Sequence, residues 1–358
     1  MIRMQIKNKI VPKGYLAFSI ASLLYLLMMH FLTGLRPEHF LIILMMNLMF
    51  YLSPGTRKFI LGFALFAVFG MLYDVMRAFP NYDFGPVDIS GLYHFEKRFF
   101  GIEYHGERLT PNEYLNAVHT TAWDLVSGFF YLNWVPVPLA FAVYLYFTNR
   151  KLFLHFGLTF LFVNLIGFSL YYVHPAAPPW YVSQFGFDLH LGTPGNTAHL
   201  SRFDDLIGIP VFASIYSKNA NVFAALPSLH CAYPVIVLFY AYRSPSRWLS
   251  WPAIIFMLGI WFAAVYSGHH YLTDVILGVL CAVSGIFLYQ FLLVRNHSYQ
   301  RFVENYATLI TRNSPKTPIK NPNQKSESRI KNQESRIKNQ ESKIKNPNQE
   351  SRIKNHNS

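Results

Sequence analysis

The amino-acid sequence predicts an all-α protein, a polytopic membrane helix bundle with about eight transmembrane helices. The first observation is composition: 52% of the 358 residues are hydrophobic and only 14% are charged, whereas soluble domains carry about 25% charged residues. The second is that several apolar runs reach the ~20 residues that a helix needs to cross a bilayer. The third is that Lys and Arg gather in short segments between these runs, as they do in cytoplasmic loops.

Eight apolar runs, separated by polar or basic residues, are expected to form the spans. The first run is too long for the core of a signal peptide and further runs follow it, so we expect a span there and no cleaved signal. The 33 Phe and 23 Tyr suit lipid contact and interfacial belts. The approximate ranges are 14–35, 40–52, 59–76, 125–147, 152–173, 227–243, 248–266 and 271–294.

Two polar segments, 77–122 and 174–225, are too long for simple turns. The first contains Pro111-Asn-Glu-Tyr114, which predicts the start of an interfacial helix. The segments between spans on the other face are short and basic, and the positive-inside rule places them in the cytoplasm. With eight spans, both termini are then cytoplasmic and the two long polar segments lie outside.

The C-terminal segment 315–358 is a repetitive basic tail, with eleven Lys or Arg against four Glu, a net +7 of the chain's +13. The repeat that begins at Glu327 has a period of seven, which is also the period of a coiled coil. Only Ile recurs as an apolar residue, once per repeat, and a coiled coil needs two. We therefore expect a disordered tail, which its charge holds near anionic lipid.

Two polar clusters flank the sixth and seventh runs and carry the candidate chemistry. The first is Pro227-Ser-Leu-His230 and the second contains His270-x-x-x-Asp274. Positions i and i+4 share one face of a helix, so the Asp274 carboxylate is placed to orient the His270 imidazole and free its other nitrogen as a nucleophile. A helix N-terminus near His230 favours an anion. Nucleophile, orienting acid and second histidine together suggest phosphoryl transfer through a phosphohistidine.

The order Pro-Ser-x-His followed some forty residues later by His-x-x-x-Asp resembles the second and third signatures of the type 2 phosphatidic acid phosphatase superfamily. Leu229 where phosphatases usually carry Gly, the doubled His269-His270 and the upstream Pro178-Pro179-Trp180-Tyr181 are similar to the inositol phosphorylceramide synthase branch. The resemblance covers about residues 60–295. It implies a six-helix catalytic core like that of lipid phosphate phosphatases.

The resemblance implies roles for the site residues. His270 would attack phosphorus, Asp274 would orient it, and His230 would protonate the leaving oxygen. The superfamily's first signature, a Lys with an Arg-Pro seven residues on, is absent, which leaves the source of positive charge at the phosphate open. The further candidates for binding substrate or phosphate are Ser228, Arg202, Trp180, Tyr181 and His269.

Each of these further candidates also has a plainer interpretation. Ser228 suits a helix N-cap, and Trp180 and Tyr181 suit an interfacial aromatic belt. Arg202 suits a solvated loop, and His269 suits a structural or substrate-contact role, since it lacks the i+4 spacing to Asp274. We expect Leu229 and the aromatic pair to help exclude water from the pocket.

The predicted organisation is an N-terminal basic flank with two transmembrane helices (1–58), a catalytic membrane domain (59–295), a connecting segment (296–314) and the tail (315–358). The expected function is transfer of a phospho-headgroup from a glycerophospholipid, phosphatidylinositol in the first instance, to ceramide, with diacylglycerol released. A lipid phosphate phosphatase, with water as acceptor, is the alternative. A transporter or lipid-binding protein without catalytic activity is a third interpretation. Such a protein is expected to lack at least one of His230, His270 and Asp274, and this sequence has all three.

Membrane lipids are the expected partners, and nucleic acid is not. No nucleotide-binding loop or metal-ligand cluster stands out, so we expect neither cofactor nor metal. The expected location is the bacterial inner membrane, with the active site on the extracytoplasmic face. The oligomeric state is left open.

Overall fold

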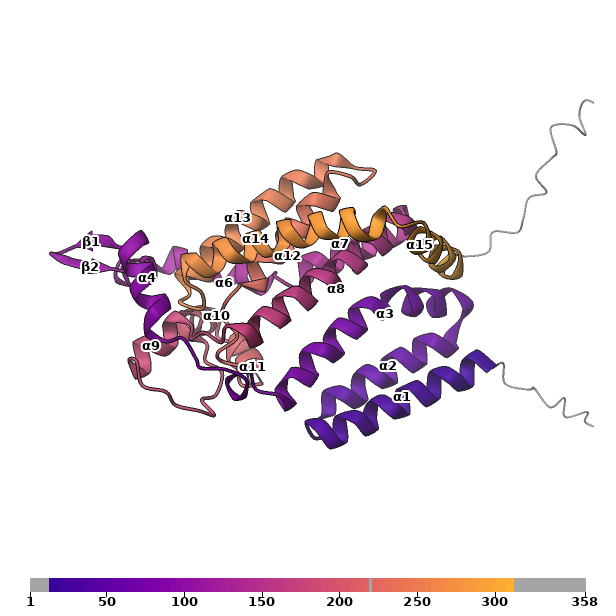
Figure 1. Cartoon of the computed structure of the whole chain (residues 1–358), viewed down its shortest axis with the longest axis horizontal. Coiled ribbons are helices and arrows are strands. Elements are labelled where there is room, and N and C mark those ends of the chain that lie inside the picture. Colours follow the sequence, from indigo (N-terminus) through magenta and orange to yellow (C-terminus); the bar gives the residue numbers. More distant parts are fainter. Residues whose placement is uncertain (1–12, 219–220, 312–358) are drawn as a thin grey trace, which may run out of the picture. The chain divides into compact units, whose positions relative to one another are not determined.

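A computed structural model describes residues 13–218 and 221–311, and its long helices run side by side (Figure 1). The start of α1 and the whole of α15 lie at one end of this unit, and α4, α9 and the β-hairpin lie at the other. The longer helices are α1 (Lys13–Leu32), α2 (Pro37–Leu52), α3 (Pro54–Val75), α6 (Thr121–Leu132), α7 (Pro136–Thr148), α8 (Arg150–Val173), α12 (Leu229–Ala241), α13 (Ser250–Tyr266), α14 (Leu272–Leu288), which continues as a π-helix (Tyr289–Val294), and α15 (His297–Ile310).

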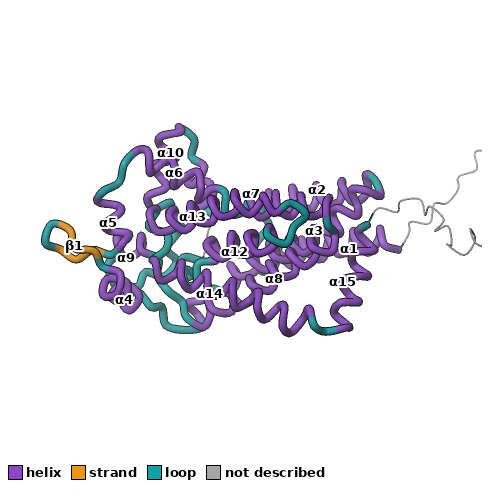
Figure 2. The backbone as a smooth tube through the Cα atoms, turned by 90° about the horizontal axis from the view of Figure 1, so that it is seen from above, coloured by secondary structure: helices purple, strands orange, loops and turns teal. Residues whose placement is uncertain are grey.

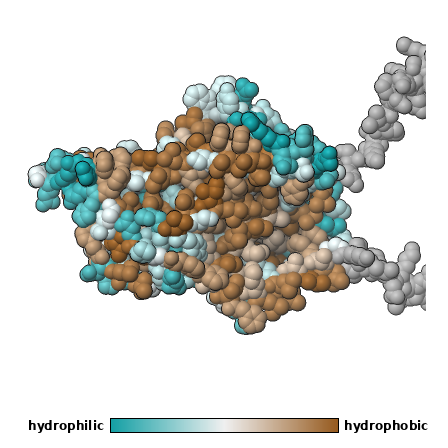
Figure 3. Space-filling view, in the orientation of Figure 1, coloured by the Kyte–Doolittle hydropathy of each residue, from teal (hydrophilic) through white to brown (hydrophobic). Residues whose placement is uncertain are grey.

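The chain is an integral membrane protein. Five of the described helices are long and apolar enough to cross a membrane, and six spans result if α6 and α7 together count as one. Two shorter apolar helices, α2 and α12, bring the number of apolar segments to the eight that the sequence predicts. The space-filling view shows a broad apolar surface over the helices, with polar residues at the hairpin end and at the opposite end (Figure 3).

The predicted continuous span 125–147 is wrong in one respect, because the structure breaks it into α6 and α7, bent by 43°. Pro136 is the first residue of α7. Proline suits the first turn of a helix, but it cannot donate the backbone hydrogen bond that would continue α6. The bend places Tyr131 and Trp134 beside the ring of His230.

Helix α12 lies in the middle of the helices, beside α8, α13 and α14 (Figure 2). Two glycines permit this packing. A Cβ on Gly278 of α14 would lie 2.2 Å from the backbone oxygen of Ser228, and a Cβ on Gly167 of α8 would lie 2.6 Å from Leu229. The buried residues of α7, α8, α12 and α14 form the largest apolar cluster of the described chain.

The polar segment 77–122 folds into α4 (Ser90–Phe100), a hairpin of β1 (Ile102–Tyr104) and β2 (Glu107–Leu109), and α5 (Pro111–Ala117). In the antiparallel hairpin Ile102 faces Leu109. The helix predicted from Pro111 is confirmed: Thr110 caps it by accepting from the Glu113 backbone, and Glu113 accepts from the Thr110 backbone. The sequence did not predict α4 or the hairpin.

The second polar segment carries α9 (Pro179–Phe185), α10 (Ser201–Ile207) and α11 (Val211–Tyr216). The predicted connecting segment after residue 295 contains α15, whose Val303 and Ile310 pack in the main apolar cluster. The predicted boundaries at 58 and 295 thus fall inside one compact unit that ends at Thr311. The predicted tail, 315–358, lies outside the described residues.

Candidate active site

Two histidines from distant parts of the chain meet at one end of α12. His230 is the second residue of α12, and His270 lies in the turn between α13 and α14. Nδ1 of His230 lies 3.0 Å from Nε2 of His270. The sequence-predicted pair is therefore in direct contact.

The turn that carries His270 is closed by its own backbone and by α5. Gly268 adopts φ +75°, which a residue with a Cβ rarely adopts. The His270 backbone N–H donates to Ala264 at 3.1 Å, and the Asn112 side-chain amide donates to the oxygens of Val265 and His270 at 2.7 and 2.8 Å. His270 is consequently held from both sides.

Asp274 lies behind His270, as predicted, but the two do not share a helix. Helix α14 begins at Leu272, so His270 precedes it, and the expectation of an i, i+4 pair on a helical face is corrected. The fully buried Asp274 accepts the Tyr271 backbone N–H at 2.9 Å, and the same oxygen lies 3.5 Å from Nδ1 of His270. The first turn of α14, closed by this cap, brings the two side chains together.

The hydrogen bonds define the tautomer of His270. Its Nδ1 lies 3.1 Å from the backbone oxygen of Ala225, and a carbonyl oxygen can only accept, so Nδ1 carries the proton. Burial lowers the pKa of His270 to about 4, so the ring is neutral near pH 7. Nε2 therefore holds a lone pair, which accepts a hydrogen bond from Nδ1–H of His230. This is the state that a nitrogen nucleophile requires.

Glu96 of α4 supports this turn, and sequence reasoning missed it. Its buried carboxylate accepts the backbone N–H groups of Leu272 and Thr273 at 2.8 and 3.1 Å and the hydroxyl of Thr273 at 2.5 Å. These are the free donors of the first turn of α14. A single acid in a polar segment, 176 residues from its partner, carries no local sequence signal.

A small cavity of about 50 Å³ adjoins both histidines. The described residues that line it include no Lys or Arg. His269 forms one wall: its ring stacks on Tyr216 at 4.4 Å and on Tyr131 at 5.4 Å, and its Nε2–H donates to the backbone of Thr197 at 3.0 Å. Burial lowers the pKa of His269. This residue, which the sequence suggested as a substrate contact, is therefore neutral and forms part of the cavity wall.

The predicted aromatic pair separates into two roles. Trp180 lines the cavity, and its backbone N–H donates to the backbone oxygen of Gly268 at 3.0 Å, which ties α9 to the turn that carries His270. Tyr181 points into the protein instead. Its hydroxyl donates to the Asp188 backbone at 2.9 Å and accepts from the His190 backbone at 2.7 Å, so it braces a loop.

Leu229 and Ser228 lie at the start of α12 but do not line the cavity. The Leu229 side chain packs against Gly167 in the apolar core, so the expectation that it forms a pocket wall is wrong. The Ser228 hydroxyl is buried without a hydrogen-bond partner and does not cap the helix. The Ser228 backbone N–H donates to the backbone oxygen of Asp274 at 3.0 Å, which ties the start of α12 to the first turn of α14.

Arg202 lies on α10 and is held by other groups. It is 3.5 Å from the Asp124 carboxylate and 3.4 Å from Nδ1 of His199, and it donates to the Asn116 side chain. It does not line the cavity at the histidines. Lys218, which follows α11, lies 3.9 Å from Glu38.

The arrangement suits a nucleophile and an acid on opposite sides of a small electrophilic centre. One nitrogen of His270 is available for attack while the other is anchored, and His230 faces it with a transferable proton. Among residues 13–218 and 221–311, no group of three His, Cys, Asp or Glu side chains is placed to hold a metal ion.

Comparison with known proteins points to lipid chemistry. A family model described as the PAP2 superfamily matches residues 108–288. Phosphoinositol dihydroceramide synthase of Bacteroides thetaiotaomicron is 46% identical over 300 residues, covering 83% of this chain and 98% of that protein. Inositol phosphorylceramide synthase of Candida albicans is 32% identical over 36% of this chain and 27% of its own length.

The inositol phosphorylceramide synthase catalytic subunit of Saccharomyces cerevisiae is 36% identical over 33% of this chain and 29% of its own length. The two fungal matches thus span less than a third of each fungal protein. No solved structure matches the chain.

Proposed function

Because the chain belongs to the PAP2 superfamily, we propose that it is a lipid phosphotransferase that moves a phosphoinositol group from phosphatidylinositol to ceramide or dihydroceramide. The observation that carries this proposal is the contact of His230 with His270, with Asp274 behind it, inside the matched region. The 46% identical relative is named for the synthesis of phosphoinositol dihydroceramide, which supports the choice of transferred group and acceptor.

In the first half of the reaction, Nε2 of His270 attacks phosphorus and forms an N–P bond. The P–O bond to diacylglycerol breaks, and protonated His230 gives its proton to the departing oxygen. As the ring of His270 becomes positive, the Ala225 carbonyl and the Asp274 carboxylate hold its Nδ1–H and stabilise the charge. Asp274 thus orients the ring without exchanging a proton.

In the second half, the hydroxyl of the ceramide attacks phosphorus and gives its proton to His230. The N–P bond breaks, which restores neutral His270. The headgroup leaves as phosphoinositol ceramide, so the proton and phosphorus balances close over the cycle. Two displacements at phosphorus explain why one acid–base group suffices.

The structure has the two rings in contact, so the phosphate must enter between them. Attack requires Nε2 and phosphorus to lie ~3–3.5 Å apart, and His230 must stand within ~3 Å of the leaving oxygen. The two ring nitrogens, 3.0 Å apart here, must then separate to about 6 Å or more. We therefore expect the His230 side chain to move when the substrate binds. This movement would change its edge-on packing against Trp134, whose ring centroid lies 4.4 Å away.

The proposed site opens on the extracytoplasmic face. His270 lies in the turn between α13 and α14, and this turn lies at the end of the bundle opposite α15 and the start of α1 (Figure 1). His230 contacts His270 and lies at the same end. The short basic turns near Arg150 and Arg247 suit the cytoplasm. This orientation agrees with the inner-membrane location and cytoplasmic termini expected from the sequence.

Purified protein with labelled phosphatidylinositol, with and without ceramide, tests the proposal by lipid chromatography. We expect labelled phosphoinositol ceramide and diacylglycerol only when ceramide is present, and little free inositol phosphate. His270→Ala protein is the matched control for contaminating enzymes. Brisk hydrolysis that ceramide does not change would instead establish the phosphatase alternative.

A further inference from the structure

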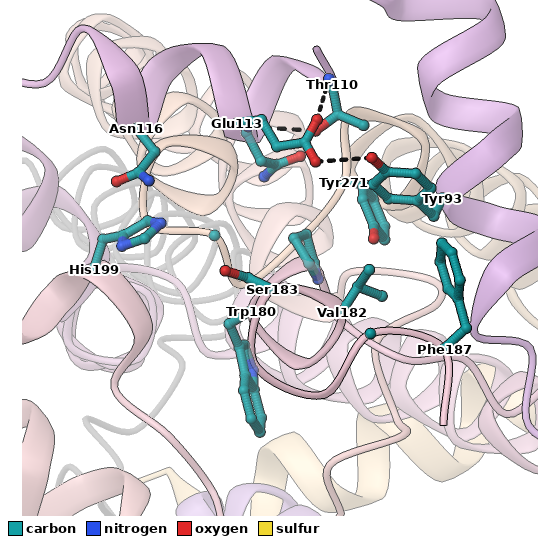
Figure 4. A pocket seen from close by; sticks show the side chains of 14 residues that line it. Tyr93, Thr110, Glu113, Asn116, Trp180, Val182, Ser183, Phe187, His199 and Tyr271 are labelled. Atoms are coloured by element: carbon teal, nitrogen blue, oxygen red, sulfur yellow. Dashed lines mark hydrogen bonds between the residues drawn. The ribbon is translucent and has the colours of Figure 1, made fainter. Parts of the chain in front are cut away.

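A second, larger cavity lies next to the catalytic one and is built from different elements. It has a volume of about 260 Å³ and is enclosed by α4, α5, α9 and the turn before α14 (Figure 4). Trp180 and the catalytic turn belong to the walls of both cavities. The volume lies just below the ~300–1,000 Å³ typical of sites for drug-sized ligands, which suits one small ring.

Two residues that line this cavity each carry a buried polar atom that has no partner within the described chain. These atoms are Oδ1 of Asn112, on a residue 3% exposed, and the hydroxyl of Tyr271, on a residue 1% exposed. Figure 4 shows the Tyr271 hydroxyl pointing between Tyr93, Val182 and Phe187. Leaving such atoms unsatisfied is unfavourable, so a ligand that hydrogen-bonds to both would recover that cost.

One of these two atoms can accept a hydrogen bond from a ligand, and the other can donate one. The amide nitrogen of Asn112 is used by the backbone of Val265 and His270, so its oxygen remains as an acceptor. Burial raises the pKa of the Tyr271 phenol, so this hydroxyl keeps its proton and can donate. A group with several hydroxyls both donates and accepts, and it would satisfy both atoms.

The lining of the cavity favours neutral hydroxyls over a phosphate. Glu113 lines the cavity and is held by the Tyr93 hydroxyl at 2.9 Å and the Thr110 backbone at 2.7 Å. No Lys or Arg belongs to the described lining; the nearby cations Lys97 and Arg202 lie behind it and donate to Tyr93 and to Asn116. The Glu113 carboxylate repels an anion, whereas its free lone pairs accept hydrogen bonds from neutral hydroxyls.

The placement suits the part of a lipid headgroup beyond its phosphate. Helices α4 and α9 lie beyond the ends of α12 and α14 that carry the catalytic residues in both views of the backbone, and Figure 2 shows α5 there as well (Figures 1 and 2). A lipid whose phosphate lies at His270 extends its acyl chains toward the helices and its headgroup away from them.

We propose that this second cavity binds the neutral, polyhydroxylated ring of the donor headgroup and so selects the donor lipid. This inference rests on the proposed function, because it assigns the ring of a phosphoinositol group to a place beside the reacting phosphate. Asn112 links the two sites, since the same side chain lines the cavity and holds the His270 backbone.

A quaternary ammonium headgroup is the competing occupant, because aromatic rings and one carboxylate also attract such cations. It has no N–H or O–H, so it would leave Oδ1 of Asn112 and the Tyr271 hydroxyl without partners. The two unsatisfied atoms therefore favour the polyol.

The test compares two variants with a control in purified enzyme. Tyr271→Phe removes a hydroxyl that has no partner in the protein, and Ser183→Trp fills the cavity from an exposed position on α9. Tyr144→Phe, on α7 and outside both cavities, is the matched control. The measurements are KM and kcat for phosphatidylinositol with ceramide, transfer from phosphatidylcholine, and inhibition by inositol 1-phosphate and inorganic phosphate.

We expect wild-type enzyme to be inhibited about tenfold more strongly by inositol 1-phosphate than by inorganic phosphate, since several hydrogen bonds add to binding. Tyr271→Phe should raise KM about three- to tenfold and Ser183→Trp by more. In both variants, inositol 1-phosphate and inorganic phosphate should differ less in the strength of inhibition than they do with the wild-type enzyme. In both, kcat should change less than KM. Tyr144→Phe should keep wild-type KM.

Three results overturn the assignment. They are equal inhibition of the wild-type enzyme by the two anions, unchanged KM in both variants, and preferred transfer from phosphatidylcholine. A wild-type enzyme that transfers no phosphoinositol at all overturns the proposed function itself. That failure is recognised without any variant, so the two are distinguishable.

Discussion

Nδ1 of His230 lies 3.0 Å from Nε2 of His270, so two side chains forty residues apart form one hydrogen-bonded unit. Nδ1 of His270 is held at the same time by the Ala225 backbone, with the Asp274 carboxylate 3.5 Å away. The unit therefore has an anchored side and a side that faces the cavity. The predictions that follow depend on this asymmetry.

His270→Ala, His230→Ala and Asp274→Ala should each lower kcat by ~10³-fold or more, because nucleophile, acid and orienting group act together. Combining any two should cost little more than the worse single change. Labelled-lipid transfer per mole of folded, membrane-inserted protein is the measurement. Near-normal turnover of His270→Ala would refute its role as nucleophile.

The acid limb of kcat/KM should lie nearer pH 4 than the ordinary histidine pKa of about 6.5. Burial lowers the pKa of His270 to about 4, so the nucleophile stays neutral as the pH falls through 6.5. As the pH falls, His270 is protonated in the unfolded chain before it is protonated in the folded protein. The contribution of His270 to the free energy of unfolding is therefore complete above about pH 6.5 and is lost between pH 6.5 and 4. Transfer assays and thermal unfolding across pH 4–8 test both parts, and a limb at 6.5 with unchanged stability contradicts them.

Glu96→Gln should lower kcat about tenfold and lower the free energy of unfolding by ~1–3 kcal/mol, because a Gln amide cannot accept all the N–H and O–H groups that Glu96 accepts. The loosened first turn of α14 would misplace Asp274 relative to His270. Glu103→Gln in the exposed part of the hairpin is the matched control. Wild-type kcat in Glu96→Gln would show that α14 needs no cap from α4.

Gly278→Ala should destabilise the protein by ~1–3 kcal/mol or more, as overpacking does, and should lower activity. The added Cβ would meet the Ser228 backbone at 2.2 Å and push α12 away from α14. Gly70→Ala in α3 is the control, because its Cβ meets nothing within 4 Å. Thermal unfolding of the two variants in one detergent separates steric conflict from the general effect of replacing glycine. Equal stability would contradict the close approach.

Ser183→Cys should react with a membrane-impermeant thiol reagent from the extracytoplasmic side, and Ser246→Cys should not. The background carries Cys231→Ala and Cys281→Ala, since both native cysteines are buried. The expectation rests on the Lys and Arg bias and on the position of α9 at the end opposite α15. Permeabilised membranes provide the control for reactivity, and outside labelling of Ser246→Cys would reverse the topology.

Much of the fold was predictable because each membrane helix is formed by one continuous segment of the chain. Seven of the eight predicted apolar runs each correspond to one helix among the described residues, since a bilayer demands both length and internal hydrogen bonding from one stretch of chain. The break between α6 and α7 was missed, although Pro136 marks it, because hydropathy alone does not distinguish a straight helix from a bent one. The short α4 and hairpin were missed because few residues carry their pattern.

The candidate site, too, was predictable from the sequence only in part. His230, His270 and Asp274 carry a spacing that is visible in the chain, and the structure brings them together. Arg202 is committed to Asp124, and Tyr181 to backbone groups of its own loop. Whether a polar side chain in a long loop faces a cavity or the interior depends on the path of that loop, which local spacing does not encode.

Composition and spacing within short stretches were enough to establish the membrane class and the apolar segments and to predict the candidate reacting groups. The packing of distant segments was needed to show which nitrogen of His270 is free, which residue caps α14 and where a second cavity lies. Each of these depends on contacts between separate segments of the chain, such as Ala225 with His270, Glu96 with Thr273 and Asn112 with His270. Such contacts form only when the helices pack, and glycines such as Gly278 set how closely they do so.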